Sequence, residues 1–96
     1  MLINKGISSG SVITLKLTSG EEIIARLSEK TATGYRVLKP LVLTMGPKGI
    51  GLIPYLITAN LENELEIFNS AVAVVTETDK DPSDQYIQNT TGIRMA

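Results

Sequence analysis

The sequence predicts an all-β domain, either a small barrel or a sandwich. Among its 96 residues, 43% are apolar, and Leu, Ile and Val supply most of them. These are residues that fit a pleated, half-buried strand. Turn residues interrupt the apolar runs at the spacing of roughly 8–12 residues that is typical of sandwiches and barrels. A chain of this length predicts one domain over residues 1–96.

The first elements form a hairpin. Residues 1–11 are rich in Gly and Ser, which favours a loose lead-in. Apolar and polar side chains then alternate over 12–18, as in a strand with one buried face. The Ser19-Gly20 pair predicts a tight turn, because glycine supplies the positive φ that hairpin turns need. A second strand follows over 21–28.

The third predicted strand, residues 35–45, contains Pro40. Proline cannot donate a ladder hydrogen bond, so Pro40 marks an edge position, a bulge or a sharp bend. A bend suits a small barrel, whose strands must curve to close. Further strands are predicted over 50–58, 64–68 and 71–76, so the barrel covers 12–76.

The tail over 77–96 predicts a short helix at about 82–91. Asp81 is placed as its N-cap, Pro82 as its first residue and Gly92 just past its end. Tyr86 and Ile87 are its only strongly apolar side chains, so we expect these two to dock it.

The residue types that are missing exclude many enzymes. The chain has no Cys and no His, which removes thiol nucleophiles, Ser-His-Asp triads and zinc sites built on thiolate or imidazole. We therefore expect a protein that is not an enzyme and that needs no cofactor or metal. Without disulfides, a signal-peptide pattern or a long apolar run, we expect a cytoplasmic protein with no membrane partner.

Charge is unevenly distributed along the chain. Residues 1–48 carry seven basic and three acidic side chains, a net charge of +4. Residues 49–96 carry two basic and seven acidic side chains, a net charge of −5. This asymmetry is compatible with a nucleic-acid face, with two surfaces that attract each other, or with chance clustering on solvated faces.

Two local patterns bear on chemistry and on assembly. Glu62, Glu64 and Glu66 lie at a spacing of two, which suits either paired acid-base carboxylates or a solvated row on one face of a strand. The solvated row is the better interpretation, since Leu65 and Ile67 take the opposite face. Residues 71–75 are uncharged and favour β structure, so leaving them on an exposed sheet edge would risk aggregation. We therefore expect this segment to be buried inside the barrel or to pair with an edge strand of a second subunit.

Residues 12–27 resemble the first Sm motif, in which an alternating strand, a turn with Gly and a returning strand follow one another. Leu38 falls where the next strand of that motif carries its apolar residue. From about residue 10 to residue 93, including Pro40 and the ending from Tyr86, the chain is similar to small Sm-like proteins encoded by marine cyanophages.

This resemblance implies a strongly bent five-stranded antiparallel barrel of the SH3 type. It also implies a homo-oligomeric closed ring of roughly five to seven subunits, in which the last strand of one subunit pairs with the fourth of its neighbour. Relatives bind single-stranded, often U-rich RNA at the pore, between the loop after the second strand and the loop between the fourth and fifth. For a phage protein the implied location is the host cytoplasm.

The resemblance assigns four candidate RNA-binding positions. Thr31 stands where the first motif has an Asp, and Tyr35 where it has the Asn that contacts a base. Phe68 and Asn69 stand where the second motif has Arg-Gly. Tyr35 and Phe68 either stack bases or pack in the barrel or an interface.

The leading hypothesis is therefore a ring that binds single-stranded RNA without catalysis, in RNA regulation or processing. The alternative is a ring-forming interaction or assembly module that does not bind RNA. The sequence pI of about 5.3 favours this alternative, because strong phosphate binding needs positive charge.

Overall fold

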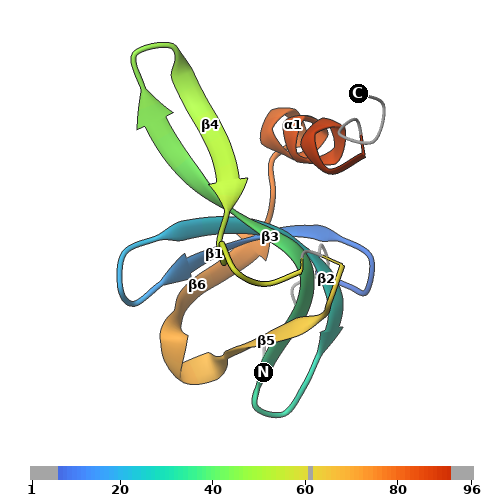
Figure 1. Cartoon of the computed structure of the whole chain (residues 1–96). Helices are drawn as coiled ribbons and strands as arrows, with labels where there is room; N and C mark the ends of the chain where they lie inside the picture. The colour runs from blue at the N-terminus through green and yellow to red at the C-terminus, as the bar shows by residue number, and fades with distance from the viewer. Residues whose placement is uncertain (1–6, 61, 92–96) are drawn as a thin grey trace.

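The first two strands build the centre of one antiparallel sheet (Figure 1). The computed structural model describes residues 7–60 and 62–91. Strands β1 (Val12–Leu17) and β2 (Glu22–Lys30) pair in an antiparallel hairpin, closed by the predicted turn in which Gly20 has a φ of 112°. Alternate side chains point inward as the sequence pattern predicts. The largest apolar cluster contains Ile13, Leu15, Leu17, Ile23, Ala25, Leu27, Val37 and Ile67.

The remaining elements extend this sheet on both sides. They are β3 (Gly34–Gly46), β4 (Gly49–Pro54), β5 (Leu65–Phe68), the 3₁₀ turn η1 (Asn69–Ala71), β6 (Val72–Glu77) and the helix α1 (Lys80–Thr91). The strand order is β4-β3-β2-β1-β6, and β5 pairs with β3. Because η1 joins β5 directly to β6, the chain itself connects the two sides of the bent sheet (Figure 1). The predicted all-β class with one short C-terminal helix is confirmed.

The structure has six strands where the resemblance implies five, because the strand opposite β3 is divided. β4 pairs with the second half of β3, and β5 pairs with its first half. The strand predicted over 50–58 ends at Pro54, which lacks the N–H that a ladder requires. Tyr55 then donates its backbone N–H to the carbonyl oxygen of Pro40 at 2.9 Å. This bond holds the chain that follows β4 beside β3.

A bulge in β3 resolves the three interpretations left open for Pro40. Ile24 pairs with Leu41, and two residues later Arg26 pairs with Leu38. One residue of β2 therefore faces both Lys39 and Pro40, which is a β-bulge. Lys39 has a φ of 51°, which lies in the left-handed region and costs about 1 kcal/mol or more for a residue other than glycine. The bulge turns β3 away from the barrel.

The Tyr86 side chain of α1 fills this bulge. Its ring is only 1% exposed and packs with Val12, Ile24 and Leu41. Its hydroxyl accepts the backbone N–H of Arg26 at 3.1 Å, and its single proton is shared between the carbonyl oxygens of Leu38 and Lys39, at 3.1 and 2.9 Å. The hydroxyl thus satisfies backbone groups that the bulge leaves without ladder partners.

The helix begins earlier than the sequence predicts. It starts at Lys80 rather than at about residue 82. The backbone carbonyl oxygen of Asp79 accepts the backbone N–H of Ser83 at 2.9 Å. Pro82 lies in the first turn, where a missing N–H costs nothing. Docking through Tyr86 is confirmed, but Ile87 is 37% exposed and does not share that role. The expected stop at Gly92 lies outside the described residues.

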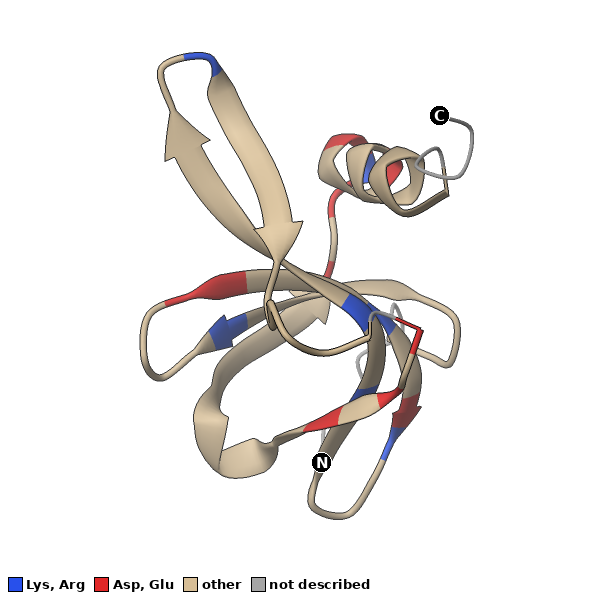
Figure 2. Ribbon diagram, viewed as in Figure 1, with Lys and Arg blue, Asp and Glu red and all other residues tan. Residues whose placement is uncertain are grey.

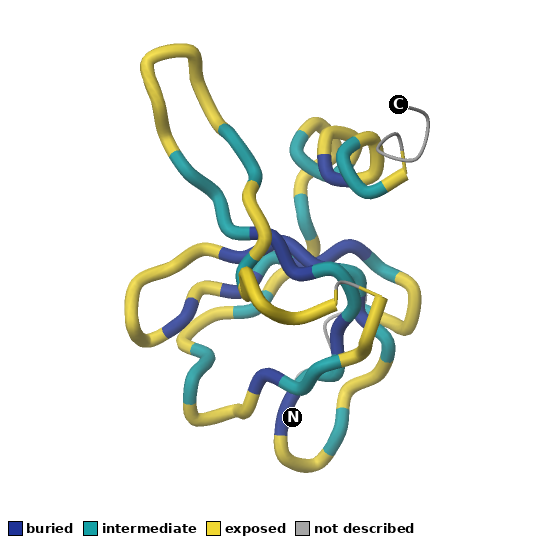
Figure 3. The backbone as a smooth tube through the Cα atoms, viewed as in Figure 1, coloured by how far each residue is buried: buried dark blue, intermediate teal, exposed yellow. Residues whose placement is uncertain are grey.

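Beyond the bulge, residues 41–54 form a two-stranded arm that projects from the barrel (Figure 1). Its tip is exposed (Figure 3), and Lys48 is its only charged residue (Figure 2). Leu43, Ile50 and Leu52 line a cleft of about 160 Å³ between the arm and α1. Across this cleft, the side-chain amide of Gln85 on α1 donates to the carbonyl oxygen of Ile50 at 3.5 Å. Within the described residues, β4 pairs only with β3.

No helix in the described part of the chain has the length and apolar character that crossing a membrane requires.

Replacing Tyr86 with Phe keeps the ring but removes the hydroxyl. We expect the free energy of unfolding to fall by about 1–3 kcal/mol, because buried backbone groups of β2 and β3 lose their partner. Urea denaturation followed by circular dichroism measures this loss. Tyr55→Phe is the matched control, since it removes the same hydroxyl from a tyrosine that is only half-buried. Equal effects of the two substitutions would contradict the role of the bulge.

The same residue predicts a loss of stability at alkaline pH. Burial raises the pKa of Tyr86 to about 12, although the N–H donated by Arg26 acts in the opposite direction. In the unfolded chain the pKa is about 10. Between these values only the unfolded state releases the phenolic proton, so the free energy of unfolding falls by about 1.4 kcal/mol per pH unit. The Tyr86→Phe protein lacks this component, and its stability should converge on that of the parent as pH rises from 10 to 12. Parallel curves would refute the assignment.

Candidate nucleic-acid interface

The four residues assigned by resemblance lie at one end of the barrel. Thr31 and Tyr35 flank the turn between β2 and β3, and this turn packs against the junction of β5 with η1. Asn69 donates its backbone N–H to Thr33 at 2.8 Å, and Gly34 pairs with Phe68 in the ladder. Two segments that are more than 30 residues apart in the sequence therefore meet here.

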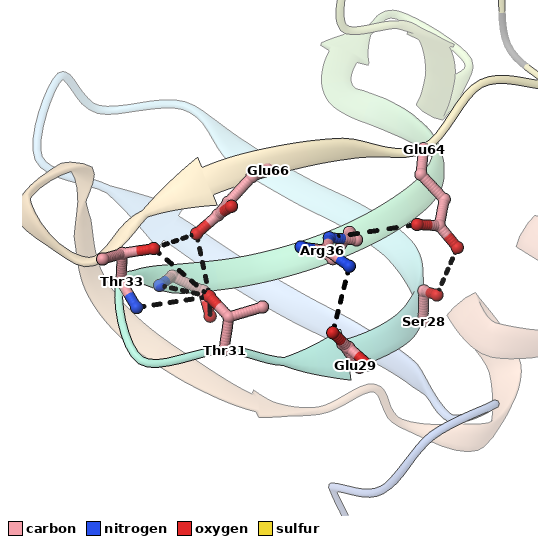
Figure 4. A network of polar contacts seen from close by, with 8 residues as sticks. Ser28, Glu29, Thr31, Thr33, Arg36, Glu64 and Glu66 are labelled. Carbon is pink, nitrogen blue, oxygen red and sulfur yellow. Dashed lines mark hydrogen bonds and ion pairs between the residues drawn. The ribbon is translucent and has the colours of Figure 1, made fainter.

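Thr31 organises the turn (Figure 4). Its Oγ1 accepts the backbone N–H groups of Thr33 and Gly34 at 3.2 and 3.0 Å. The same hydroxyl lies 2.8 Å from Glu66 Oε2, to which it donates. Since both donor and acceptor capacity are used within the protein, Thr31 shapes the site and has no spare group for a ligand.

Glu66 is held in place by this turn. Its Oε2 accepts hydrogen bonds from the hydroxyls of Thr33 and Thr31. These bonds, the one from Thr33 first, lower the pKa of the carboxyl group below its ordinary value, and the nearby charges of Arg36 and Lys30 act in the same direction. Glu66 is therefore an ionised acceptor with a fixed side chain. We call Thr31, Thr33 and Glu66 the Glu66 network.

The two aromatic residues do not face the same side of the sheet. Tyr35 pairs with Ile67, points toward the interior and packs against the main apolar cluster. Phe68 lies on the outer face and is 57% exposed. Of the two interpretations considered from sequence, packing fits the position of Tyr35 and an open stacking surface fits Phe68. One base on the outer face cannot contact both rings.

Lys30 supplies the positive charge at this end. Its Nζ lies 4.8 Å from the centroid of the Tyr35 ring, a distance that permits a cation–π interaction. It also donates to the carbonyl oxygen of Thr31 at 2.6 Å and to Asn69 Oδ1 at 3.5 Å. Asn69 in turn donates its side-chain amide to the carbonyl of Ala32 at 3.3 Å. The lysine therefore stands between the turn and η1.

The row of glutamates has more partners than a purely solvated row. Glu64 accepts from the hydroxyl of Ser28 and lies 3.9 Å from Arg36 Nε (Figure 4). The carboxylate of Glu62 lies 3.7 Å from Lys39 Nζ. Basic residues of the first half of the chain thus meet acidic residues of the second half within one molecule. Exposed pairs of this kind contribute about 0–1 kcal/mol each, so they favour the register of β5 on β3 and do little for overall stability.

Sequence reasoning missed Lys30, Thr33 and the role of Glu66. The signal for Glu66 was present in the alternation of residues 62–66, but its partners lie on a turn more than 30 residues earlier. Thr33 and Lys30 belong to a polar turn that has no motif of its own. Only strand pairing between β3 and β5 brings these groups together.

The outer edges of the sheet bear on the assembly hypothesis. β6 pairs with β1 on one side only, and β5 pairs only with β3 within the described residues. The uncharged segment 71–75 is partly buried, because Ala71, Val72 and Val75 pack against the main apolar cluster while Val74 is 54% exposed. Pairing of this segment with a second subunit stays a prediction.

A comparison of the chain with protein-family models and with curated proteins finds no match to either.

Gly34 is required for the close approach of the two halves of the site. A Cβ at this position would collide with the carbonyl oxygen of Ile67 and lie 2.9 Å from the Cα of Phe68. We therefore expect Gly34→Ala to lower the free energy of unfolding by more than about 2 kcal/mol and to separate β5 from β3. Gly46→Ala is the matched control, because its nearest neighbour would lie at 3.9 Å. Thermal denaturation compares them, and equal stability would contradict the packing described.

Proposed function

We propose that this protein is a non-catalytic, Sm-like RNA-binding protein that works as a homo-oligomeric ring. The observation that carries the proposal is the exposed ring of Phe68, set beside a rigid polar turn at one end of the barrel. An exposed aromatic side chain next to a fixed set of hydrogen-bonding groups is the usual platform for a single-stranded base.

The chemistry required is binding alone. A base stacks on Phe68, which contributes about 1–3 kcal/mol. Charge attraction contributes little, since Arg36 is held by Glu29 at 3.0 Å and by Glu64, and Lys30 lies on the side of Tyr35, where it donates to the carbonyl oxygen of Thr31. The supporting turn does not have to move, because its hydrogen bonds are already made.

The ring part of the proposal is supported by the sheet edges. Among the described residues, β6 is the edge strand at one end of the bent sheet, and β4 and β5 are both edge strands at the other end. Antiparallel pairing of β6 with the neighbour's β5 would satisfy both rows of backbone groups and cover Val74. Each subunit then presents one Phe68, so several weak contacts act together on one RNA strand.

One observation favours the alternative of an assembly module without RNA. By the register of β2, β3 and β5, the outer face around Phe68 carries Glu29, Glu64 and Glu66 against Arg36, while Lys30 lies on the side of Tyr35, so the net charge of these residues on the outer face is negative. A face of this charge repels phosphates at a distance. Binding by stacking at short range is then expected to be weak for one subunit and to depend on several subunits.

Binding of fluorescein-labelled six-nucleotide RNAs, measured by anisotropy, tests the proposal. Phe68→Ala should weaken binding by at least about 5- to 150-fold, which is the loss of one base stack, and by more where the strand contacts several subunits. Met45→Ala is the control, because it removes another exposed apolar side chain, one that is 78% exposed on the arm. Native mass spectrometry of the same samples measures the ring.

A ring that binds no RNA at high micromolar concentration would establish the assembly module instead. A monomer at micromolar concentration would rule out both forms of the proposal. Loss of the ring in Phe68→Ala would show that this side chain packs in the interface and does not bind bases.

A further inference from the structure

Glu66 and Phe68 lie on the same outer face of β5. Ile67 between them is buried, so its two neighbours point outward. Alternate residues of a strand are about 6.5–7 Å apart, which is close to the width of a base. A base that stacks on Phe68 therefore has its edge within reach of the Glu66 carboxylate.

The carboxylate is fixed and only half used. Oε2 accepts from both Thr31 and Thr33, which fixes the side chain beside the turn (Figure 4). Oε1 makes no hydrogen bond to any described residue. A carboxylate that remains ionised is acceptor-only, so Oε1 can contact a ligand only through a donor on that ligand.

The bases differ in the donors they offer at this edge. Cytosine, adenine and guanine each carry an exocyclic amino group, and a glutamate that accepts from cytosine N4 is a known form of base recognition. Uracil offers only its ring N–H, which lies between two carbonyl oxygens. Those oxygens repel a carboxylate, so uracil is the base that fits Oε1 least.

We propose that Glu66 makes this site select single-stranded RNA with an amino-bearing base, cytosine, adenine or guanine, over uracil, and cytosine and adenine are the two that the test below uses. This inference rests on the proposed RNA-binding function and goes beyond it, because it reverses the U-rich preference that the resemblance implies. Phe68 supplies the stacking surface, which accepts any base. Glu66 supplies the choice between bases.

The test compares six-nucleotide oligo(C), oligo(A) and oligo(U), titrated by anisotropy at one salt concentration. The parent protein should bind oligo(C) and oligo(A) about 5- to 100-fold more tightly than oligo(U). In Glu66→Gln this preference should fall to less than about twofold, because the amide can also donate to the carbonyl oxygens of uracil. The amide oxygen still accepts from the two threonines, so the turn keeps its shape.

Glu64→Gln is the matched control. It removes the same charge from the same face, two residues away, and therefore reproduces any general gain in phosphate binding. It should leave the preference for amino-bearing bases as it is in the parent. The difference between the two variants isolates the base contact from net charge.

The outcomes separate the two proposals. Tighter binding of oligo(U), or an unchanged preference in Glu66→Gln, overturns the selection by Glu66 and leaves RNA binding intact. Equal changes in both variants also overturn it, since charge alone then explains them. Absence of binding to all three oligonucleotides overturns RNA binding and this inference together.

Discussion

The structure depends on the β-bulge in its longest strand, β3, and on the Tyr86 side chain, whose hydroxyl makes hydrogen bonds to the backbone at that bulge. At Lys39 and Pro40 the ladder between β2 and β3 breaks, and Lys39 adopts a left-handed backbone. The buried hydroxyl of Tyr86 reconnects the freed backbone groups of both strands. Because that hydroxyl comes from α1, the helix, the bulge and the second apolar cluster form one unit. Without it, the bend would leave polar backbone groups buried and unpaired.

The bend also gives β3 two separate roles. Its first half stays in the barrel and pairs with β5, which places the turn at Thr31 beside Phe68. Its second half leaves the barrel and pairs with β4 as the arm. The candidate RNA site and the arm are therefore at opposite ends of one strand, and the bulge between them fixes their relative direction. A straight strand would bring neither β5 nor the helix to its present place.

The electrostatics of the site follow from this arrangement. The basic first half of the chain and the acidic second half meet across β3, where Arg36 and Lys39 lie beside Glu64 and Glu62. Two basic residues of the first half and two acidic residues of the second half thus pair within one molecule. What remains at the barrel end is one lysine, an exposed ring and a fixed carboxylate. Such a site favours recognition of a base at short range over attraction of phosphates at long range.

The sequence by itself determined the all-β class, the first hairpin, a bend or bulge at Pro40 and the docking of the tail through Tyr86. These features are local, and each is predicted by a short stretch of sequence. The patterns are the alternation of apolar and polar residues, the glycine turns, the missing N–H of proline and one large apolar side chain on a polar helix. The tertiary structure alone decided that β3 pairs with two strands and that Tyr35 points inward while Phe68 points outward. It also decided that Thr31 and Thr33 hold Glu66. These features depend on the register between segments more than 30 residues apart, and a shift of one residue in that register exchanges the two faces of the strand.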